Sequence, residues 1–297
     1  MKHTTSGLFA GIVLILAVGE QARGANVTKE GDGEAIVLAR EHYLPTAGTI
    51  ITEESANTMV EAAFKATVGE QEIAGTMTRN GTGEITREIL SANKFRYLLE
   101  SKTTTGRTKI NGKEKASPEK TDPLVGIPVI LERKDGKWSA SLENGDHPSA
   151  EQKASLDKQV AAAEKDSDFG MYGDTPRKPG DKWDVDPAKL TDFGDAVGIT
   201  GECRVEFLEV RKLHGVRCAV LKATFDLQGK TQGTGGASKM DIRMKGEAVS
   251  HRSIADMIDL EVVMDGTFTT NGSPKPQMTM HMEGPIRVTA KNTLKKP

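Results

Sequence analysis

Apolar and polar residues alternate along most of the chain, which is the pattern of half-buried β-strands. Asn80-Gly81 and Asp135-Gly136 interrupt this alternation and have the composition of tight hairpin turns. In the first half of the chain the pattern predicts strands over residues 58–68, 72–78, 84–90, 95–105, 127–133 and 137–142, an extension over 108–111 and a polar loop over 112–124.

The last third of the chain returns to the same alternation. Residues 203–225 read as a hairpin that turns at Leu213-His214-Gly215, and 229–236 read as a flexible Gly/Thr loop. Three long runs with few interruptions follow, over residues 239–251, 256–270 and 277–293. Strands of this length suit a strongly curved or barrel-like sheet.

The centre of the chain differs from both ends. Ser149 and Gln152 have the spacing of a capping box, and apolar residues recur at helical intervals after them, which predicts a helix over 149–165. A Gly/Pro-rich link over 170–180 and a short helical turn over 188–193 follow.

The sequence therefore predicts a mainly β fold with one central helix. The strands form one or more curved antiparallel sheets, with a half-barrel or barrel-like shape. Residues 25–297 form the β-rich domain, and the pattern also fits two strand-rich halves, about 40–145 and 198–294, joined by helix 149–165.

Residues 1–24 have the three parts of a secretory signal peptide. Lys2 is followed by an apolar run of 12 residues over 7–18 and then by small and polar residues that end at Gly24, the favoured cleavage site. The run is shorter than the roughly 20 residues that a membrane span needs. We therefore expect a secreted or periplasmic protein without an integral membrane segment, and an uncleaved anchor is the alternative.

Composition excludes one class of partner. The net charge is −2 and the basic residues form no stripe, so nucleic acid is not expected as a partner. Aromatic residues make up 4% of the chain, too few for a stacking platform.

Two cysteines in an exported chain raise the question of a disulfide. In the hairpin over 203–225, Cys218 would face residues near 209–211, and Cys203 would lie roughly 20–26 Å farther along the strand. A disulfide requires Cα atoms within about 7 Å, so two buried, unpaired thiols are favoured over a Cys203–Cys218 bond.

Methionines are concentrated in the last third, and Met278, Met280 and Met282 occupy one face of a strand. Such a row usually fills a core. It also suits an apolar ligand cavity, with Met278, Met280 and Met282 as the binding residues. Met280, Met282 and His281 offer soft ligands for Cu(I), although the alternation turns His281 toward the opposite face.

No catalytic motif has its required companions, so an enzyme is not expected, although a hydrolase whose site is assembled from distant residues remains open. The acidic residues Asp166 and Asp168 lack the spacing of a calcium loop and are expected in a solvated turn. No cofactor is implied.

Gly180-Asp181-Lys182-Trp183 and the hairpin segment 215–220, together with the leader and the strand meander, resemble a loose group of exported bacterial proteins of unknown activity. The architecture also resembles the open half-barrels of lipoprotein-carrier and related envelope lipid-binding proteins. This resemblance implies a curved sheet wrapped over helices and an apolar ligand, and it transfers no functional residue.

These observations favour an exported, soluble, non-enzymatic protein that binds an apolar small molecule or an envelope protein in a curved β-sheet. A structural or interaction module of the cell envelope and a Met/His copper-binding protein are the alternatives.

Overall fold

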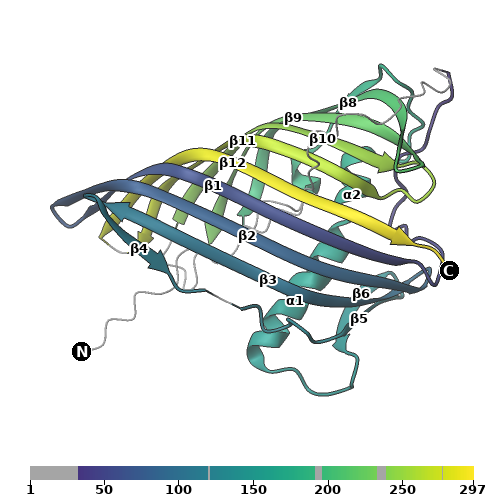
Figure 1. Ribbon diagram of the computed structural model, residues 1–297, viewed down its shortest axis with the longest axis horizontal. Helices are drawn as coiled ribbons and strands as arrows, with labels where there is room; N and C mark the ends of the chain where they lie inside the picture. The colour runs from purple at the N-terminus through teal and green to yellow at the C-terminus, as the bar shows by residue number, and fades with distance from the viewer. Residues whose placement is uncertain (1–32, 120, 191–195, 233–238, 276) are drawn as a thin grey trace.

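The computed structural model describes residues 33–119, 121–190, 196–232, 239–275 and 277–297. The predicted signal peptide, residues 1–24, lies outside the described residues. The described chain forms a 12-stranded antiparallel sheet that curves around two helices (Figure 1). The prediction of a mainly β fold with a central helix and a curved sheet is confirmed.

The N-terminal half supplies β1 (Ile50–Val68), β2 (Gln71–Ser91), β3 (Lys94–Ile110), β4 (Lys113–Ser117), β5 (Val129–Lys134) and β6 (Lys137–Leu142). The C-terminal half supplies β7 (Lys182–Asp184), β8 (Ala196–Leu213), β9 (Val216–Gln232), β10 (Lys239–Ser253), β11 (Asp259–Lys275) and β12 (Met278–Lys295).

The two strand-rich regions belong to one sheet, in the order β6-β5-β3-β2-β1-β12-β11-β10-β9-β8-β7, with β4 paired to the end of β3. Their junction is the antiparallel pairing of β1 with β12, which runs from Ile50 opposite Lys295 to Val68 opposite Met278. The sheet is open, because its edge strands β6 and β7 do not pair with each other.

The predicted central helix is confirmed as α1 (Ala150–Lys165). Its capping box is present: Ser149 Oγ accepts from Gln152 N at 3.2 Å, and Gln152 Oε1 accepts from Ser149 N at 2.9 Å. Asp166 then adopts a left-handed conformation with φ 44° and caps a second helix, α2 (Ser167–Tyr172). The predicted turn near 188 is the 3-10 helix η1 (Pro187–Lys189).

One predicted interruption is wrong, whereas the turn at Asp135-Gly136 is confirmed between β5 and β6. Asn80-Gly81 is not a turn, because β2 runs through it and the chain reverses at Gly69-Glu70 instead. Gly81 lies opposite Asn57, and a Cβ on this glycine would come within 2.6 Å of Asn57 Nδ2. The glycine therefore leaves room for the Asn57 side chain and does not form a turn.

The loop predictions for 112–124 and 229–236 are only partly correct. The first segment contains the exposed strand β4, and β9 continues through Gly229 to Gln232. Residues 233–236 lie outside the described residues. The turn at Leu213-His214-Gly215 is confirmed, with φ 48° at His214 and 83° at Gly215.

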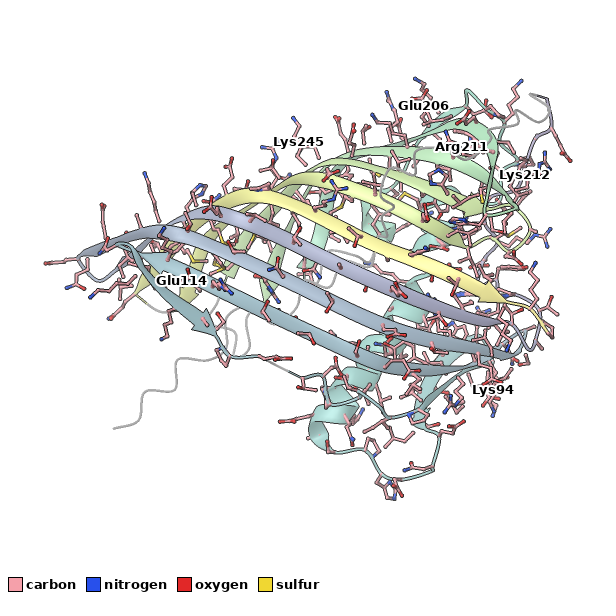
Figure 2. The ribbon with its side chains drawn as sticks, in the orientation of Figure 1. Lys94, Glu114, Glu206, Arg211, Lys212 and Lys245 are labelled. Atoms are coloured by element: carbon pink, nitrogen blue, oxygen red, sulfur yellow. The ribbon has the colours of Figure 1, made fainter. Side chains whose placement is uncertain are left out.

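The side chains divide between the two faces of the sheet. Ion pairs join neighbouring strands across the convex face, for example Arg243–Asp226 at 2.6 Å and Arg287–Asp265 at 3.0 Å. Figure 2 shows Lys245 projecting from this face. The opposite, concave face holds the main apolar cluster on β8–β12 and β1, while a smaller cluster packs β3, β5 and β6 against Leu156 of α1.

Candidate functional site

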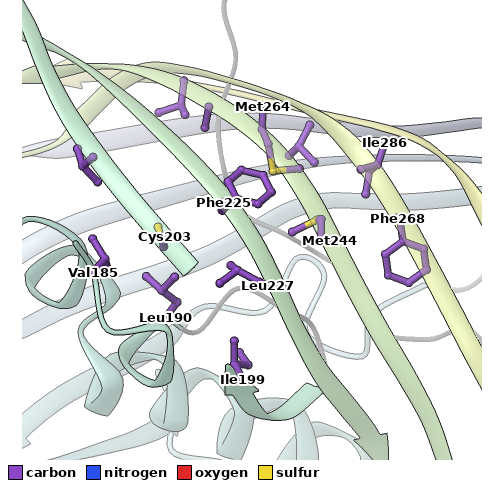
Figure 3. Packing of buried hydrophobic residues seen from close by; sticks show 14 of the residues in the cluster. Val185, Leu190, Ile199, Cys203, Phe225, Leu227, Met244, Met264, Phe268 and Ile286 are labelled. Carbon is purple, nitrogen blue, oxygen red and sulfur yellow. The ribbon is translucent and has the colours of Figure 1, made fainter. Parts of the chain in front are cut away.

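The concave face is lined by apolar residues at alternate positions of β9 to β12. Cross-strand pairing places Leu227, Met244 and Phe268 in one row, and Met264 and Val288 in another. Each of these side chains is buried, and they point to the same side of the sheet (Figure 3). With 17 and 18 residues, β11 and β12 are each about 55–60 Å long. The apolar face is therefore an elongated trough.

Glycines allow this trough to curve. Gly246 and Gly266 lie directly opposite each other on β10 and β11. A Cβ on Gly266 would come within 2.6 Å of the Lys245 carbonyl oxygen, so no other residue fits without a backbone shift. Phe225 and Ile286 occupy the flanking positions of the same row, on β9 and β12. Paired glycines beside large apolar residues are a known means of bending a sheet.

Helix α2 covers one end of the trough and leaves a small apolar cavity there. The cavity measures about 50 Å³ and lies between α2 and strands β8 to β11. Apolar side chains make up most of its wall, including Val205, Phe225, Met244 and Val262. Its volume is well below the 300 Å³ or more of a typical small-molecule pocket.

The methionines proposed as ligands from the sequence lie on this face. Met280 and Met282 are buried in the main apolar cluster, and Met278 packs against it half-buried. His281 is exposed on the opposite face, where its Nδ1 hydrogen-bonds Asn271 Oδ1. The structure therefore groups the three methionines and separates His281 from them.

Both cysteines are buried and unpaired, as the sequence predicts. Cys203 lies opposite Phe225, and Cys218 lies opposite Arg211 at the other end of the hairpin. Burial raises the pKa of each thiol to about 11, and Asp184 contributes further at Cys203. Cys203 also lines the small apolar cavity.

Arg79 also places a charge on the concave face, at the β1–β3 side of the trough. It lies opposite Met59 on β1 and Gly106 on β3. Burial lowers the pKa of this guanidinium.

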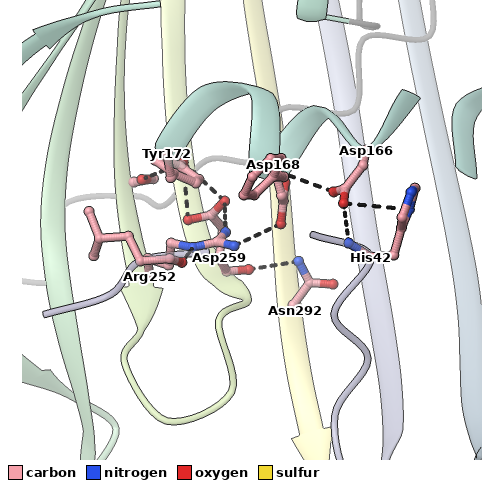
Figure 4. Close-up of polar contacts among 10 residues, drawn as sticks. His42, Asp166, Asp168, Tyr172, Arg252, Asp259 and Asn292 are labelled. Atoms are coloured by element: carbon pink, nitrogen blue, oxygen red, sulfur yellow. Dashed lines mark hydrogen bonds and ion pairs between the residues drawn. The ribbon is translucent and has the colours of Figure 1, made fainter. Parts of the chain in front are cut away.

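A group of polar side chains centred on a buried arginine, which we call the Arg252 cluster, lies where α2 meets β10 and β11 (Figure 4). It consists of Arg252, Asp168, Tyr172, Ser250 and Asp259. The guanidinium of Arg252 donates to Asp259 Oδ2 and to Asp168 Oδ2, both at 2.9 Å, and its Cζ lies 4.3 Å from the centre of the Tyr172 ring. Asp168 is 55% exposed, as expected of a solvated acid, but it lies in the first turn of α2 and pairs with a fully buried arginine.

Electrostatics inside the cluster follow from burial. Burial acts to lower the pKa of Arg252, but the two carboxylates outweigh it and hold that pKa above its usual range. Burial raises the pKa of Asp259, against the opposing effect of Arg252. It also raises the pKa of Tyr172, with a further contribution from Asp259. The contacts of Arg252 with Asp168 and Tyr172 anchor α2 to the sheet.

A larger cavity of about 310 Å³ adjoins this cluster, between the helices and the sheet. Its wall mixes apolar groups with polar side chains from several strands, among them Glu53, Arg87, Tyr97 and Asn292. The sequence analysis missed these residues. The adjacent acids Glu53 and Glu54 were the available indication, since neighbouring strand residues point to opposite faces and one acid must therefore point inward.

Comparisons with known proteins establish no family. No protein-family model matches the chain, and no curated protein matches it. Among solved structures, the fold is similar to lipovitellin, in a structure solved for its lipid–protein interactions, with TM-score 0.41, 9% identity and 85% of this chain covered. The chain spans about a quarter of that protein, 26% of its length.

Two outer-membrane proteins are also similar. The outer membrane protein OprG from Pseudomonas aeruginosa matches with TM-score 0.21 and 7% identity, over 86% of this chain and 99% of that protein. An outer membrane channel from Pseudomonas putida F1 matches with TM-score 0.23 and 7% identity, over 85% and 98%. At these TM-scores the likenesses establish no shared function. Neither α1, α2 nor any other helix in the described ranges is long and apolar enough to span a bilayer.

Proposed function

We propose that the protein is an exported, non-enzymatic carrier that binds an apolar molecule along the concave face of its sheet. The observation that carries the proposal is the trough of Met, Phe, Leu and Val side chains on β9 to β12. Unbranched methionines such as Met244, Met264 and Met282 adapt their shape to differently shaped apolar partners.

The dimensions of the trough and of the helices support this proposal. Helix α1 has 16 residues and α2 has 6, which correspond to about 24 Å and 9 Å. The long strands extend for more than twice the length of α1. Among the described residues, these helices span only part of the length of the apolar face, whose side chains are otherwise buried against one another and against β1 to β3.

The first test asks what the protein carries. Protein purified from its own cell envelope and examined by native mass spectrometry is expected to retain an apolar molecule, released as a lipid-like mass on denaturation. After delipidation, the uncharged probe N-phenyl-1-naphthylamine is expected to bind with increased fluorescence. An apo mass without any uptake of the probe would contradict the proposal.

Matched variants on β11 locate the site. Phe268 is 3% exposed on the concave face, and its neighbour Thr267 is exposed on the convex face. Phe268→Asp is expected to weaken probe binding about tenfold or more, while Thr267→Asp leaves it unchanged. Phe268→Ala, which places no charge in the core, is the milder variant should Phe268→Asp not fold. Equal binding by the Phe268 and Thr267 variants would place the probe elsewhere.

A further inference from the structure

The apolar cavity of about 50 Å³ and the polar cavity of about 310 Å³ are neighbours. Both are lined by Met171, Tyr172, Leu190 and Val262. These four side chains form the shared wall between an apolar region on β8 to β11 and a polar region on β1, β2, β3 and β12. An elongated ligand with one polar end fits this arrangement.

The polar cavity contains a buried carboxylate with one unsatisfied oxygen. Glu53 is 2% exposed, and its Oε2 accepts from Arg87 Nη2 at 2.6 Å. Within the described part of the chain, Glu53 Oε1 has no hydrogen-bond partner. An unsatisfied buried acceptor costs about 1–3 kcal/mol, and more when the group is charged.

Two further buried atoms of residues at the cavity also lack a hydrogen-bond partner among the described residues. Asn292 lies directly opposite Glu53 on β12, and its Nδ2 donates to the Asp259 carbonyl at 2.8 Å. That bond fixes the amide so that Oδ1 is the free end, and this oxygen has no partner among the described residues. The Nε of Arg87 likewise has none there. Three residues that line the cavity therefore each carry a buried polar atom without a partner among the described residues, two acceptors and one donor.

These three atoms select the chemistry of a ligand. A hydroxyl can donate to either oxygen and accept from Arg87 Nε, so a group with several hydroxyls satisfies all three. A carboxylate or phosphate would bring acceptors against Glu53 Oε1 and Asn292 Oδ1. An ammonium group would donate to both oxygens but would leave Arg87 Nε unsatisfied.

We infer that the polar cavity binds the uncharged, hydroxyl-bearing headgroup of an amphiphile whose hydrocarbon chain lies along the apolar trough. This inference deepens the proposed function and rests on it. Glu53 and Asn292 accept hydrogen bonds from the headgroup, and Arg87 donates one to it.

Three probes with the same chain length test the headgroup. Monolauroylglycerol, lauric acid and dodecylamine are titrated into the delipidated protein, and displacement of N-phenyl-1-naphthylamine is measured. Monolauroylglycerol is expected to bind about tenfold more tightly than either charged probe. Equal affinity for all three would overturn the headgroup site, with water then satisfying the three atoms, while the apolar trough stands. If no probe displaces the dye, the proposed function fails as well.

Neighbouring residues on β1 supply the matched variants. In Glu53→Gln, the amide oxygen must face Arg87, which has only donors, so an NH₂ group replaces the free Oε1. This variant is expected to bind monolauroylglycerol about tenfold more weakly and to lose its discrimination against lauric acid. Glu54→Gln, at an exposed position of the same strand, is expected to behave as the unmodified protein. Unchanged selectivity in Glu53→Gln would overturn the inference.

A second pair of variants, on β12, tests the site if Glu53→Gln does not fold. Asn292→Leu removes the other free acceptor and is expected to weaken monolauroylglycerol binding selectively. Lys291→Leu, at the adjacent exposed position, is its control. Equal affinities of the two variants for monolauroylglycerol would overturn the headgroup site.

Discussion

At the scale of single residues, burial decides what an ion pair contributes. β10 carries two arginines that both pair with aspartates. Arg252 has a side chain that is 1% exposed and binds Asp168 and Asp259, whereas Arg243 is 58% exposed and binds Asp226 on the convex face. The same chemistry therefore occurs in two environments within one strand.

We expect Arg252→Ala to lower the free energy of unfolding by about 3–5 kcal/mol, because it leaves the largely buried carboxylate of Asp259 without its partner. It also removes the hydrogen bond from Arg252 Nε to the Leu38 carbonyl, which is 2.7 Å long. Arg243→Ala is the control and should change stability little, since water replaces an exposed partner. Urea denaturation measures both, and equal losses would contradict the assignment of Arg252 as the anchor of α2.

His251, next to the Arg252 cluster on β10, predicts a pH dependence. Burial lowers the pKa of this imidazole, and Arg211 lowers it further, against Glu261 and Glu209. The native state therefore binds fewer protons than the unfolded state below the ordinary pKa of 6.5. Stability should consequently fall as the pH drops below that value.

Urea denaturation at several pH values between about 7.5 and 5.5 should show this loss, and His251→Gln should remove its share of it. For one proton the slope is no more than about 1.4 kcal/mol per pH unit. His281→Gln, at an exposed position, serves as the control and should leave the slope as it is. An identical slope in His251→Gln would show that other groups cause the dependence.

Sequence reasoning succeeded for some residues and missed others for a physical reason. The methionine row and the two unpaired cysteines follow from strand alternation, which is local. Arg252 and Glu53 occupy inward positions where the alternation predicts apolar residues. What makes them tolerable is a partner distant in sequence, Asp168 or Arg87, and no local pattern contains that information.

At the scale of elements, the glycine pair of β10 and β11 leaves no room for a side chain between the two strands. Gly266→Ala is expected to destabilise the protein by more than about 1 kcal/mol, because its Cβ would press on the Lys245 carbonyl oxygen. Gly83→Ala on β2 is the matched control, since the nearest atom to its Cβ is the rotatable Ser55 Oγ at 3.3 Å. Thermal unfolding compares the two, and equal shifts would argue against a special role for the β10–β11 pair.

Elements, like residues, were predictable where their signals are local in the sequence and not where they depend on distant partners. Helix α1 and the hairpin at His214-Gly215 were predictable, because capping and turn chemistry are encoded within a few residues. Asn80-Gly81 was wrongly predicted as a turn, because a glycine that leaves room for a side chain of the neighbouring strand has the same local sequence as one that forms a turn. The start of β1 at Ile50 was missed because Glu53, Ser55 and Asn57 are polar residues on the inward side.

At the scale of the whole molecule, a ligand in the trough should stabilise the folded state. By mass action, a probe at a hundredfold excess over its dissociation constant adds about 2.7 kcal/mol to the free energy of unfolding. N-phenyl-1-naphthylamine is therefore expected to raise the melting temperature of the delipidated protein in a concentration-dependent way. At the same probe concentration, Phe268→Ala should show a smaller increase. A melting temperature that does not respond to the probe would indicate that it binds the unfolded chain equally well or not at all.

The arrangement of the sheet could not be predicted from the sequence. Local patterns predicted strands in both halves, and the composition of β1 and β12 gives no sign that they are neighbours. Their pairing depends on the complementarity of concave-face residues more than 200 positions apart, such as Phe64 and Met282.

The pairing of β1 with β12 also has a consequence for the biosynthesis of the protein. The middle of the sheet is built from the first and the last long strands, so β1 lacks one neighbour until translation has reached β12. Contacts that span nearly an entire polypeptide form slowly, because a very large loop must close first. The central pairing of the sheet should therefore form only after synthesis has reached β12, while the hairpins on either side of it can form earlier.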